Sequence, residues 1–229
     1  EVVQQCGVGL VRIRRDSERL AFAAPPLRRT GAADAATRAH VARSLRLPEA
    51  ALRAVQWVDN GPGWVGALLH DAAAVLALKP DFAAMAELKV GVVGPYPAGS
   101  ECAFEVRAFV PALSVPEDPV TGSLHAGLAL WLIDAGLAPA RYVASQGTAL
   151  GRAGRVHVTD FAVQELSDIE GTALFSEGGN LGREVSGLRL QLVDEDMGAE
   201  CCHYAAITAF NSSRMMRRSS LRSSLSEEL

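Results

Sequence analysis

The stretch GSLHAGLALWLIDAGLA, residues 122–138, decides the fold. It carries two sets of apolar side chains at helical spacing on opposite sides. The first set is Leu124, Leu128, Trp131, Leu132 and Ala135, and the second is Leu130, Ile133 and Leu137. A helix that is apolar almost all round has to be buried almost all round. The sequence therefore predicts a central helix that the rest of the chain encloses.

Short apolar or alternating segments surround this stretch and predict strands, since such runs bounded by turn residues are typical of β-structure. They are residues 8–14, 19–24, 55–58, 64–69, 89–93, 103–109, 142–145 and 155–158. Shorter helices are expected at residues 34–47, 71–78 and 80–87, and a loop at 111–120. Strands outnumber long helices, so we expect an α+β fold in which a curved, mostly antiparallel sheet wraps around the central helix.

Charge and hydropathy exclude two classes of partner. The 229 residues carry a formal net charge of -4, whereas a nucleic acid or an anionic membrane would require a basic surface. The longest apolar run, residues 124–138, is interrupted by His125 and Asp134 and is shorter than the ~18 residues that a membrane span needs. No signal peptide is recognisable. We expect a cytoplasmic protein with no nucleic-acid and no membrane partner.

Cysteine spacing argues against a metal centre. The four cysteines, Cys6, Cys102, Cys201 and Cys202, form neither a CxxC motif nor another metal-ligand pattern, and adjacent cysteines make a poor disulfide pair. The glycine-rich segment 147–154 lacks the GxGxxG order of a nucleotide site. We therefore expect no metal and no cofactor.

The segment EDPVTGS, residues 117–123, is the strongest candidate site, because it lies where a loop enters the central helix. A helix N-terminus offers unpaired N–H groups and a partial positive charge to an anion. Gly122 allows close approach of a ligand, Thr121 and Ser123 supply hydroxyl donors, and Asp118 can accept or position a proton. The same side chains could instead merely cap the helix, and the residues alone leave both interpretations open.

Two segments carry a resemblance to a known family. The run RAFVP at residues 107–111, followed by EDPVTGS at 117–123, resembles the signature of the PhzF-like isomerases, named for phenazine biosynthesis. Residues 146–155, QGTALGRAGR, are similar to the QG…GR segment of that family, and residues 5–11 and 58–61 also fit. The resemblance covers residues 1–158. It implies one lobe of a two-lobed, diaminopimelate-epimerase-like fold, with the active site in the cleft between the lobes.

The resemblance also implies a function. It points to an isomerase that acts by cofactor-free acid/base proton transfer on a small carboxylated metabolite, and to a possible homodimer. By the same resemblance Asp118 and Ser123 are catalytic residues, and Thr121 and Gly122 bind the substrate. His125 lies in the first turn of the helix, where it could touch the ligand or be an ordinary core residue.

The family's principal acid/base group is a glutamate in the first lobe, helped by a Gly-His-Pro-Thr segment, and neither is present in this sequence. We therefore expect a truncated enzyme that is weak or inactive by itself. The alternative is a non-catalytic single lobe that binds a small anion or serves in dimerisation.

The chain divides into four expected regions. Residues 1–27 are a remnant of the first lobe and its crossover, and residues 28–158 form the second lobe. Residues 159–210 are divergent, either as an unrelated segment or as a folded extension. Residues 211–229 are rich in serine and arginine and are expected to form a poorly ordered tail.

Overall fold

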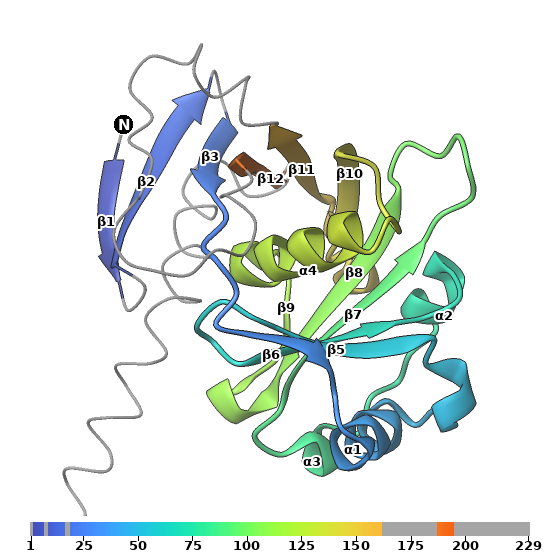
Figure 1. Ribbon diagram of the computed structural model, residues 1–229. Coiled ribbons are helices and arrows are strands. Elements are labelled where there is room, and N and C mark those ends of the chain that lie inside the picture. Colours follow the sequence, from blue (N-terminus) through green and yellow to red (C-terminus); the bar gives the residue numbers. More distant parts are fainter. Residues whose placement is uncertain (1, 7–8, 17–18, 162–186, 195–229) are drawn as a thin grey trace, which may run out of the picture.

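One continuous curved sheet organises the described residues of this computed structural model, which are 2–6, 9–16, 19–161 and 187–194 (Figure 1). Its strands are β1 (Val2–Cys6), β2 (Gly9–Asp16), β3 (Arg19–Ala23), β4 (Arg29–Ala32), β5 (Ala54–Asp59), β6 (Trp64–Leu68), β7 (Lys89–Pro95), β8 (Phe104–Val110), β9 (Val115–Asp118), β10 (Arg141–Gln146), β11 (Gly154–Phe161) and β12 (Gly187–Asp194). The helices are α1 (Ala35–Leu45), α2 (Ala72–Leu76), α3 (Phe82–Met85) and α4 (Gly122–Asp134), with 3₁₀ turns η1 (Glu49–Ala51), η2 (Pro111–Leu113) and η3 (Thr148–Leu150).

The strand order is β1-β2-β3-β12-β11-β10-β8-β7-β6-β5-β4, and β9 pairs with β8 beside this path. Two neighbouring pairs, β6 with β7 and β8 with β10, are parallel, and the other pairs are antiparallel. The mostly antiparallel, curved sheet expected from the sequence is therefore confirmed.

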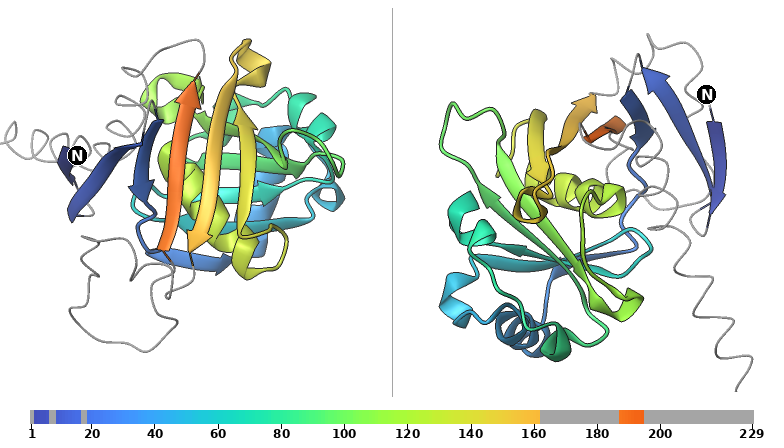
Figure 2. Two further views of the ribbon diagram at one scale, coloured as in Figure 1. Left: turned by 90° about the horizontal axis from the view of Figure 1, so that it is seen from above. Right: turned by 180° about the vertical axis from the view of Figure 1, so that it is seen from behind.

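Helix α4 lies inside the curve of the sheet, between β5–β8 and the strands β10, β11, β12 and β3 (Figures 1 and 2). On one side Leu124, Leu128 and Leu132 pack into a cluster with side chains from β5–β8 and β10. On the other side Ala126 and Ala129 pack against β11, β12, β2 and β3. The predicted central helix is confirmed, and it is buried on both of its apolar sides.

The helix ends earlier than the sequence pattern predicts. It stops at Asp134, and Gly136 then adopts a left-handed backbone with φ of 68°, a conformation that commonly terminates helices. Ala135 and Leu137 consequently lie outside the helix and are exposed. The expectation that the helix reaches Ala138 is wrong.

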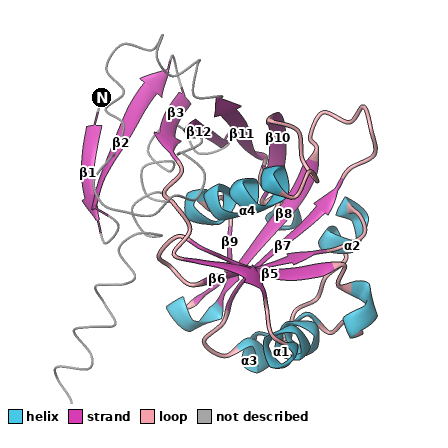
Figure 3. Cartoon of the chain, viewed as in Figure 1, coloured by secondary structure: helices cyan, strands magenta, loops and turns pink. Residues whose placement is uncertain are grey.

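Three short helices cover the outer face of β5–β8, opposite α4 (Figure 3). They bury Val41, Leu45 and Met85 against outward-facing strand residues such as Phe109. Each begins with an aspartate whose carboxylate accepts a backbone N–H: Asp34 from Thr37, Asp71 from Ala74 and Asp81 from Ala84. The helix expected from residue 34 begins there, with Asp34 as its N-cap. The helix expected from residue 80 begins only after Asp81, because this carboxylate forms the cap.

Four strands lie outside the eight segments given above for predicted strands. They are β1, β4, β9 and β12, and β9 lies within the predicted loop 111–120. Strand β12 falls in the region 159–210 that the sequence leaves unmatched, yet it pairs with β11 and β3 and closes the sheet between them. The rest of that region beyond Phe161 and the predicted tail at 211–229 lie outside the described residues.

Glycine at position 127 lets α4 approach the sheet. A Cβ atom there would lie 2.2 Å from the carbonyl oxygen of Val58, whereas a Cβ at Gly66 would lie 3.1 Å from the side chains of Leu128 and Trp131. Contacts below 3.0 Å are not tolerated without movement, and a backbone carbonyl in a paired strand cannot move as a side chain can. The closeness of helix and sheet thus depends on this residue.

We predict that Gly127→Ala lowers the free energy of unfolding by about 3 kcal/mol, the upper end of the cost of overpacking, despite the better helix propensity of alanine. Chemical denaturation of the variant measures this. Gly66→Ala is the matched control and should cost clearly less, because flexible side chains can adjust. Equal stability of Gly127→Ala and the parent protein would contradict the packing described.

Candidate functional site

Asp118 lies at the end of β9, immediately before the loop that enters α4. Its backbone position is fixed from the neighbouring strand, where Arg107 forms two hydrogen bonds of 2.8 and 2.7 Å with the carboxylate of Glu117. The carboxylate of Asp118 accepts the hydroxyl of Thr121 at 2.6 Å. Burial raises the pKa of Asp118 above its ordinary value, and the hydrogen bond from Thr121 partly opposes this.

Gln146, fully buried at the end of β10, connects this loop to the sheet. Its Oε1 accepts the backbone N–H of Thr121 at 2.9 Å. Its Nε2 donates to the carbonyl oxygen of Asp118 at 2.7 Å and to the hydroxyl oxygen of Thr121 at 3.0 Å. One amide therefore holds the end of β9 and the start of α4 together.

His125, in the first turn of α4, completes the network. Its Nε2 lies 2.9 Å from Oε1 of Gln146, and an amide oxygen can only accept, so Nε2 carries the hydrogen. Burial lowers the pKa of His125 to about 4, although the hydrogen bond to Gln146 acts in the opposite direction. His125 is 1% exposed, so of the two interpretations left open by the sequence, the structure favours a hydrogen-bonded core residue.

Ser123 is directed away from Asp118. Its hydroxyl accepts the indole N–H of Trp64 at 3.0 Å, and its carbonyl oxygen accepts Nδ2 of Asn60 at 2.8 Å. Ser123 is completely buried and attaches the start of α4 to the turn between β5 and β6. The structure thus brings Asp118 and Thr121 together and places the Ser123 hydroxyl elsewhere, and the catalytic role expected of Ser123 stays a prediction.

The N-terminus of α4 is not capped by a side chain. The first backbone hydrogen bond of the helix runs from the N–H of His125 to the carbonyl oxygen of Thr121. The N–H groups of Gly122, Ser123 and Leu124 have no acceptor among the described residues. The cap interpretation is therefore wrong, since the Thr121 hydroxyl that would serve as the cap donates to Asp118 instead. Free N–H groups at a helix N-terminus favour an anion.

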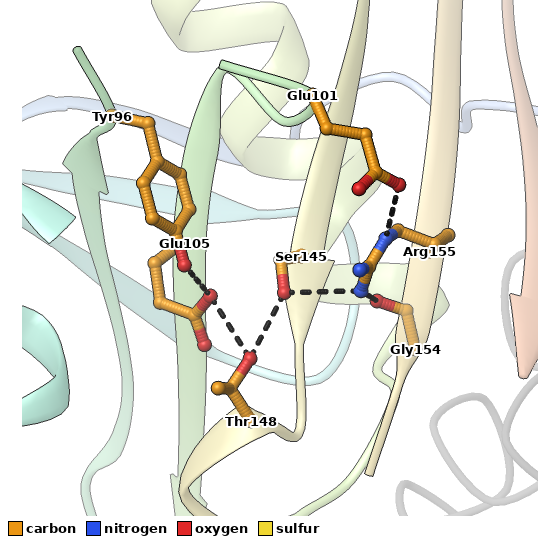
Figure 4. A network of polar contacts seen from close by, with 7 residues as sticks. All are labelled: Tyr96, Glu101, Glu105, Ser145, Thr148, Gly154 and Arg155. Carbon is orange, nitrogen blue, oxygen red and sulfur yellow. Dashed lines mark hydrogen bonds and ion pairs between the residues drawn. The ribbon is translucent and has the colours of Figure 1, made fainter.

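A second polar network supports the same region from the outer face of the sheet (Figure 4). Glu105 in β8 is completely buried and accepts the hydroxyls of Tyr96 at 2.8 Å and Thr148 at 3.2 Å. Thr148 also contacts Ser145, which accepts from Arg155. Because Ser145 and Thr148 flank Gln146 and Gly147 in the chain, this network fixes the turn that presents the Gln146 amide.

Burial raises the pKa of Glu105, while hydrogen bonds from Tyr96, Ser145 and Thr148 lower it to a smaller extent. The second oxygen, Oε1, has no hydrogen-bond partner. Burial of a carboxyl group with an unpaired oxygen disfavours its ionised form, in agreement with the raised pKa. Burial also raises the pKa of Tyr96 to about 12.

Within the described ranges, no group of three or more histidine, cysteine, aspartate or glutamate side chains is arranged to hold a metal ion. In the same part of the chain, no helix is long and apolar enough to cross a membrane.

The sequence singled out Asp118 and Thr121, which the structure brings into contact, but it did not indicate the contacts of Gln146 and Trp64. Gln146 belongs to the QG segment quoted above, yet the sequence does not indicate that it reaches Thr121, 25 positions earlier. Trp64 follows the turn after β5, and no local pattern pairs it with Ser123, 59 positions away.

Comparison with known proteins identifies a family. The sequence model of the family described as phenazine biosynthesis-like protein, PhzC-PhzF, matches residues 1–179. This match extends beyond Val158, where the resemblance was expected to stop, so that limit is wrong.

Three curated relatives illustrate the similarity. An uncharacterized isomerase of Deinococcus radiodurans is 39% identical over 100 residues, which are 39% of this chain and 32% of the relative. The uncharacterized isomerase YddE of Escherichia coli is 31% identical over 54% of this chain and 46% of its own length. Antisense-enhancing sequence 1 of Schizosaccharomyces pombe is 27% identical over 66% of this chain and 56% of its own length. The matched regions span between 32% and 56% of the length of these relatives.

Solved structures share the fold. A PhzF-family protein of Enterococcus faecalis superposes with a TM-score of 0.52 at 19% identity, over 83% of this chain and 59% of that one. A predicted epimerase of Pseudomonas aeruginosa gives a TM-score of 0.52 at 18% identity, over 81% and 60%.

We predict that Glu105→Gln removes part of the pH dependence of stability. With a pKa above its ordinary value of 4.5, Glu105 binds more protons in the folded than in the unfolded state over the interval between the two values. The free energy of unfolding therefore falls as the pH rises through that interval. Denaturation of both proteins from pH 4 upward, an approximate range set by this linkage, should show the parent protein losing stability relative to the variant.

Glu101→Gln is the control, because Glu101 belongs to the same network but its side chain is 79% exposed. The pH dependence that Glu105 contributes should persist in this variant. Parallel pH profiles for Glu105→Gln and the parent protein would show that Glu105 titrates normally.

Proposed function

Since this chain belongs to the phenazine biosynthesis-like protein family, PhzC-PhzF, we propose that it is an isomerase lobe that acts by cofactor-free acid/base proton transfer on a small carboxylated metabolite. Proteins named isomerase among its relatives support the general class of activity. A cytoplasmic location and a homodimer, which the sequence led us to expect, remain predictions, and we add the prediction of a biosynthetic role.

One observation carries this proposal: a carboxyl group with a raised pKa, Asp118, adjoins a helix N-terminus with free N–H groups. An acid/base catalyst works best when its pKa is close to the working pH, and burial moves that of Asp118 in this direction. The N–H groups of Gly122 and Ser123 suit a substrate carboxylate. A bound carboxylate would then lie beside Asp118, which could exchange a proton with the substrate.

The four residues expected in the site take different parts in this proposal. Asp118 transfers the proton, and the Thr121 hydroxyl stabilises its ionised form by donating to it. Gly122 contributes its N–H and allows close approach of the ligand. For Ser123 we propose a contribution through the backbone N–H, because its hydroxyl is already bonded to Trp64.

Isomerisation by proton transfer requires that a proton be removed and returned, and a single acid/base residue can do both. The resemblance assigns the principal acid/base role to a glutamate of the first lobe, helped by a Gly-His-Pro-Thr segment, and these 229 residues contain no such segment. We therefore propose that this lobe alone turns over substrate weakly or not at all. It would need the first lobe to form a complete site.

A non-catalytic lobe that binds a small anion is the second candidate. The free N–H groups at the start of α4 favour it, because they need no second proton-transfer group to hold an anion. The two candidates differ in whether Asp118 is required for turnover.

We predict that Asp118→Asn lowers turnover by about 100-fold to 10,000-fold, the usual contribution of a general acid or base. The measurement uses a family protein with both lobes and the segment EDPVTGS. It is incubated in D₂O with a panel of small carboxylic acids, and ¹H NMR follows the loss of C–H signals. Replacing the residue that matches Glu49, an exposed residue of η1, by glutamine is the control. Unchanged exchange in the aspartate variant would show that Asp118 is not the proton-transfer group.

We also predict that acetate binds at the start of α4 in the 229-residue chain. Titration with acetate, followed by ¹⁵N NMR, should shift the amide signals of Gly122, Ser123 and Leu124 far more than that of Ala74, whose N–H is already bonded to Asp71. Uniform small shifts along the chain would argue against an anion site and against both candidate functions.

A further inference from the structure

The orientation of the Gln146 side chain is fixed by two donors. Its Oε1 accepts the backbone N–H of Thr121 at 2.9 Å and the Nε2–H of His125 at 2.9 Å. Rotation of the amide by 180° would place its NH₂ group against both donors and lose both hydrogen bonds. Gln146 is fully buried and His125 is 1% exposed, so water cannot replace these bonds.

This orientation determines where the Thr121 hydroxyl points. The Nε2 of Gln146 donates to the hydroxyl oxygen of Thr121 at 3.0 Å. A threonine hydroxyl can normally rotate to suit its surroundings. Here one lone pair is occupied by Gln146, and the hydroxyl hydrogen lies toward Oδ2 of Asp118 at 2.6 Å. The three hydrogen bonds therefore donate in the same sense: His125 donates to Gln146, Gln146 donates to Thr121, and Thr121 donates to Asp118.

We propose that Gln146, held by His125, is a positioning residue that keeps the Thr121 hydroxyl donating to the Asp118 carboxylate. The proposal rests on the proposed function, in which Asp118 transfers the proton. Gln146 itself does not contact the Asp118 carboxylate; it bonds only to the backbone oxygen of Asp118 and to Thr121. Oδ2 is thereby kept occupied and Oδ1 is left for the substrate.

The arrangement has a chemical consequence for Asp118. Burial favours the protonated carboxyl group, whereas a hydroxyl that donates to the carboxylate favours the ionised one. If Gln146 no longer occupied the lone pair of Thr121, the hydroxyl could turn away or share its hydrogen. Asp118 would then be ionised only at higher pH.

The test is the pKa of Asp118, measured by ¹³C NMR of its carboxyl carbon in the full 229-residue chain without any substrate. Thr121→Val removes the donor, and we expect the pKa to rise by roughly one unit, the equivalent of one hydrogen bond to a charged group. Gln146→Met removes the amide from a side chain of similar length and should raise the pKa of Asp118 in the same direction. In the double variant Gln146→Met should add nothing, since it acts through Thr121.

Two controls separate positioning from general damage. Thr121→Ser retains the hydroxyl and should keep the pKa of Asp118 near that of the parent protein. His125→Gln can still donate to Gln146 and should do the same, whereas His125→Leu cannot and should raise the pKa, though less than Gln146→Met, because the N–H of Thr121 still holds the amide oxygen.

Two outcomes would overturn the proposal. One is an unchanged Asp118 pKa in Gln146→Met, and the other is an equal effect of that substitution with and without Thr121. Should Gln146→Met fail to fold, the hydroxyl proton of Thr121 in the parent protein provides the second measurement. It should exchange slowly enough with water to give its own ¹H signal, and absence of this signal would contradict a hydroxyl held in one orientation.

These measurements do not depend on turnover, so they separate the two proposals. A pKa of Asp118 that responds to Gln146, together with unchanged turnover in the Asp118→Asn protein, would leave the positioning intact and refute the proposed catalytic role. The converse result would refute the positioning alone.

Discussion

The burial of α4 on both of its apolar sides is the constraint on which the rest of the structure depends. No flat sheet can cover two opposite sides of one helix, so the sheet has to curve until β5–β8 and β10–β12 face each other across it. The approach is close enough that position 127 has no room for a side chain against Val58. The curvature of the sheet therefore follows from the apolar composition of α4, which has to be covered on two sides.

The same constraint places the site. An enclosed helix can offer its backbone donors to a ligand only at its ends, and the segment before α4 is where β9 leaves the sheet. Polar side chains then have to hold that segment, because it has no ladder partner between Asp118 and Gly122. Gln146 does so from β10, and Trp64 in β6 bonds to Ser123 directly after this segment. The ion pair between Arg107 and Glu117 fixes the preceding strand.

Buried polar groups on the two faces of the sheet differ in how completely they are hydrogen-bonded. On the inner face the amide of Gln146 forms hydrogen bonds within one connected network that ends at Asp118. On the outer face Glu105 retains an unpaired oxygen and a raised pKa, because burial disfavours its ionised form more than the donors around it favour that form. The two networks meet at residues 145–148, which contribute to both.

The sequence by itself determined the central helix, most of the strands around it and the segment that carries Asp118 and Thr121, because these depend on local periodicity, turn residues and short motifs. Strands β4 and β9 have four residues each and could not be predicted, since they exist only through pairing with a neighbour. Strand β12 was missed for a similar reason. It pairs with β3, which lies far away near the start of the chain, and with β11, from which a long segment separates it. Only the tertiary structure decided that Gln146, bonded to His125, forms hydrogen bonds with Thr121. It also decided that the Ser123 hydroxyl accepts a hydrogen bond from Trp64. The physical reason is that hydrogen bonds between residues 25 or 59 positions apart depend on how the sheet closes around α4, which no local pattern encodes.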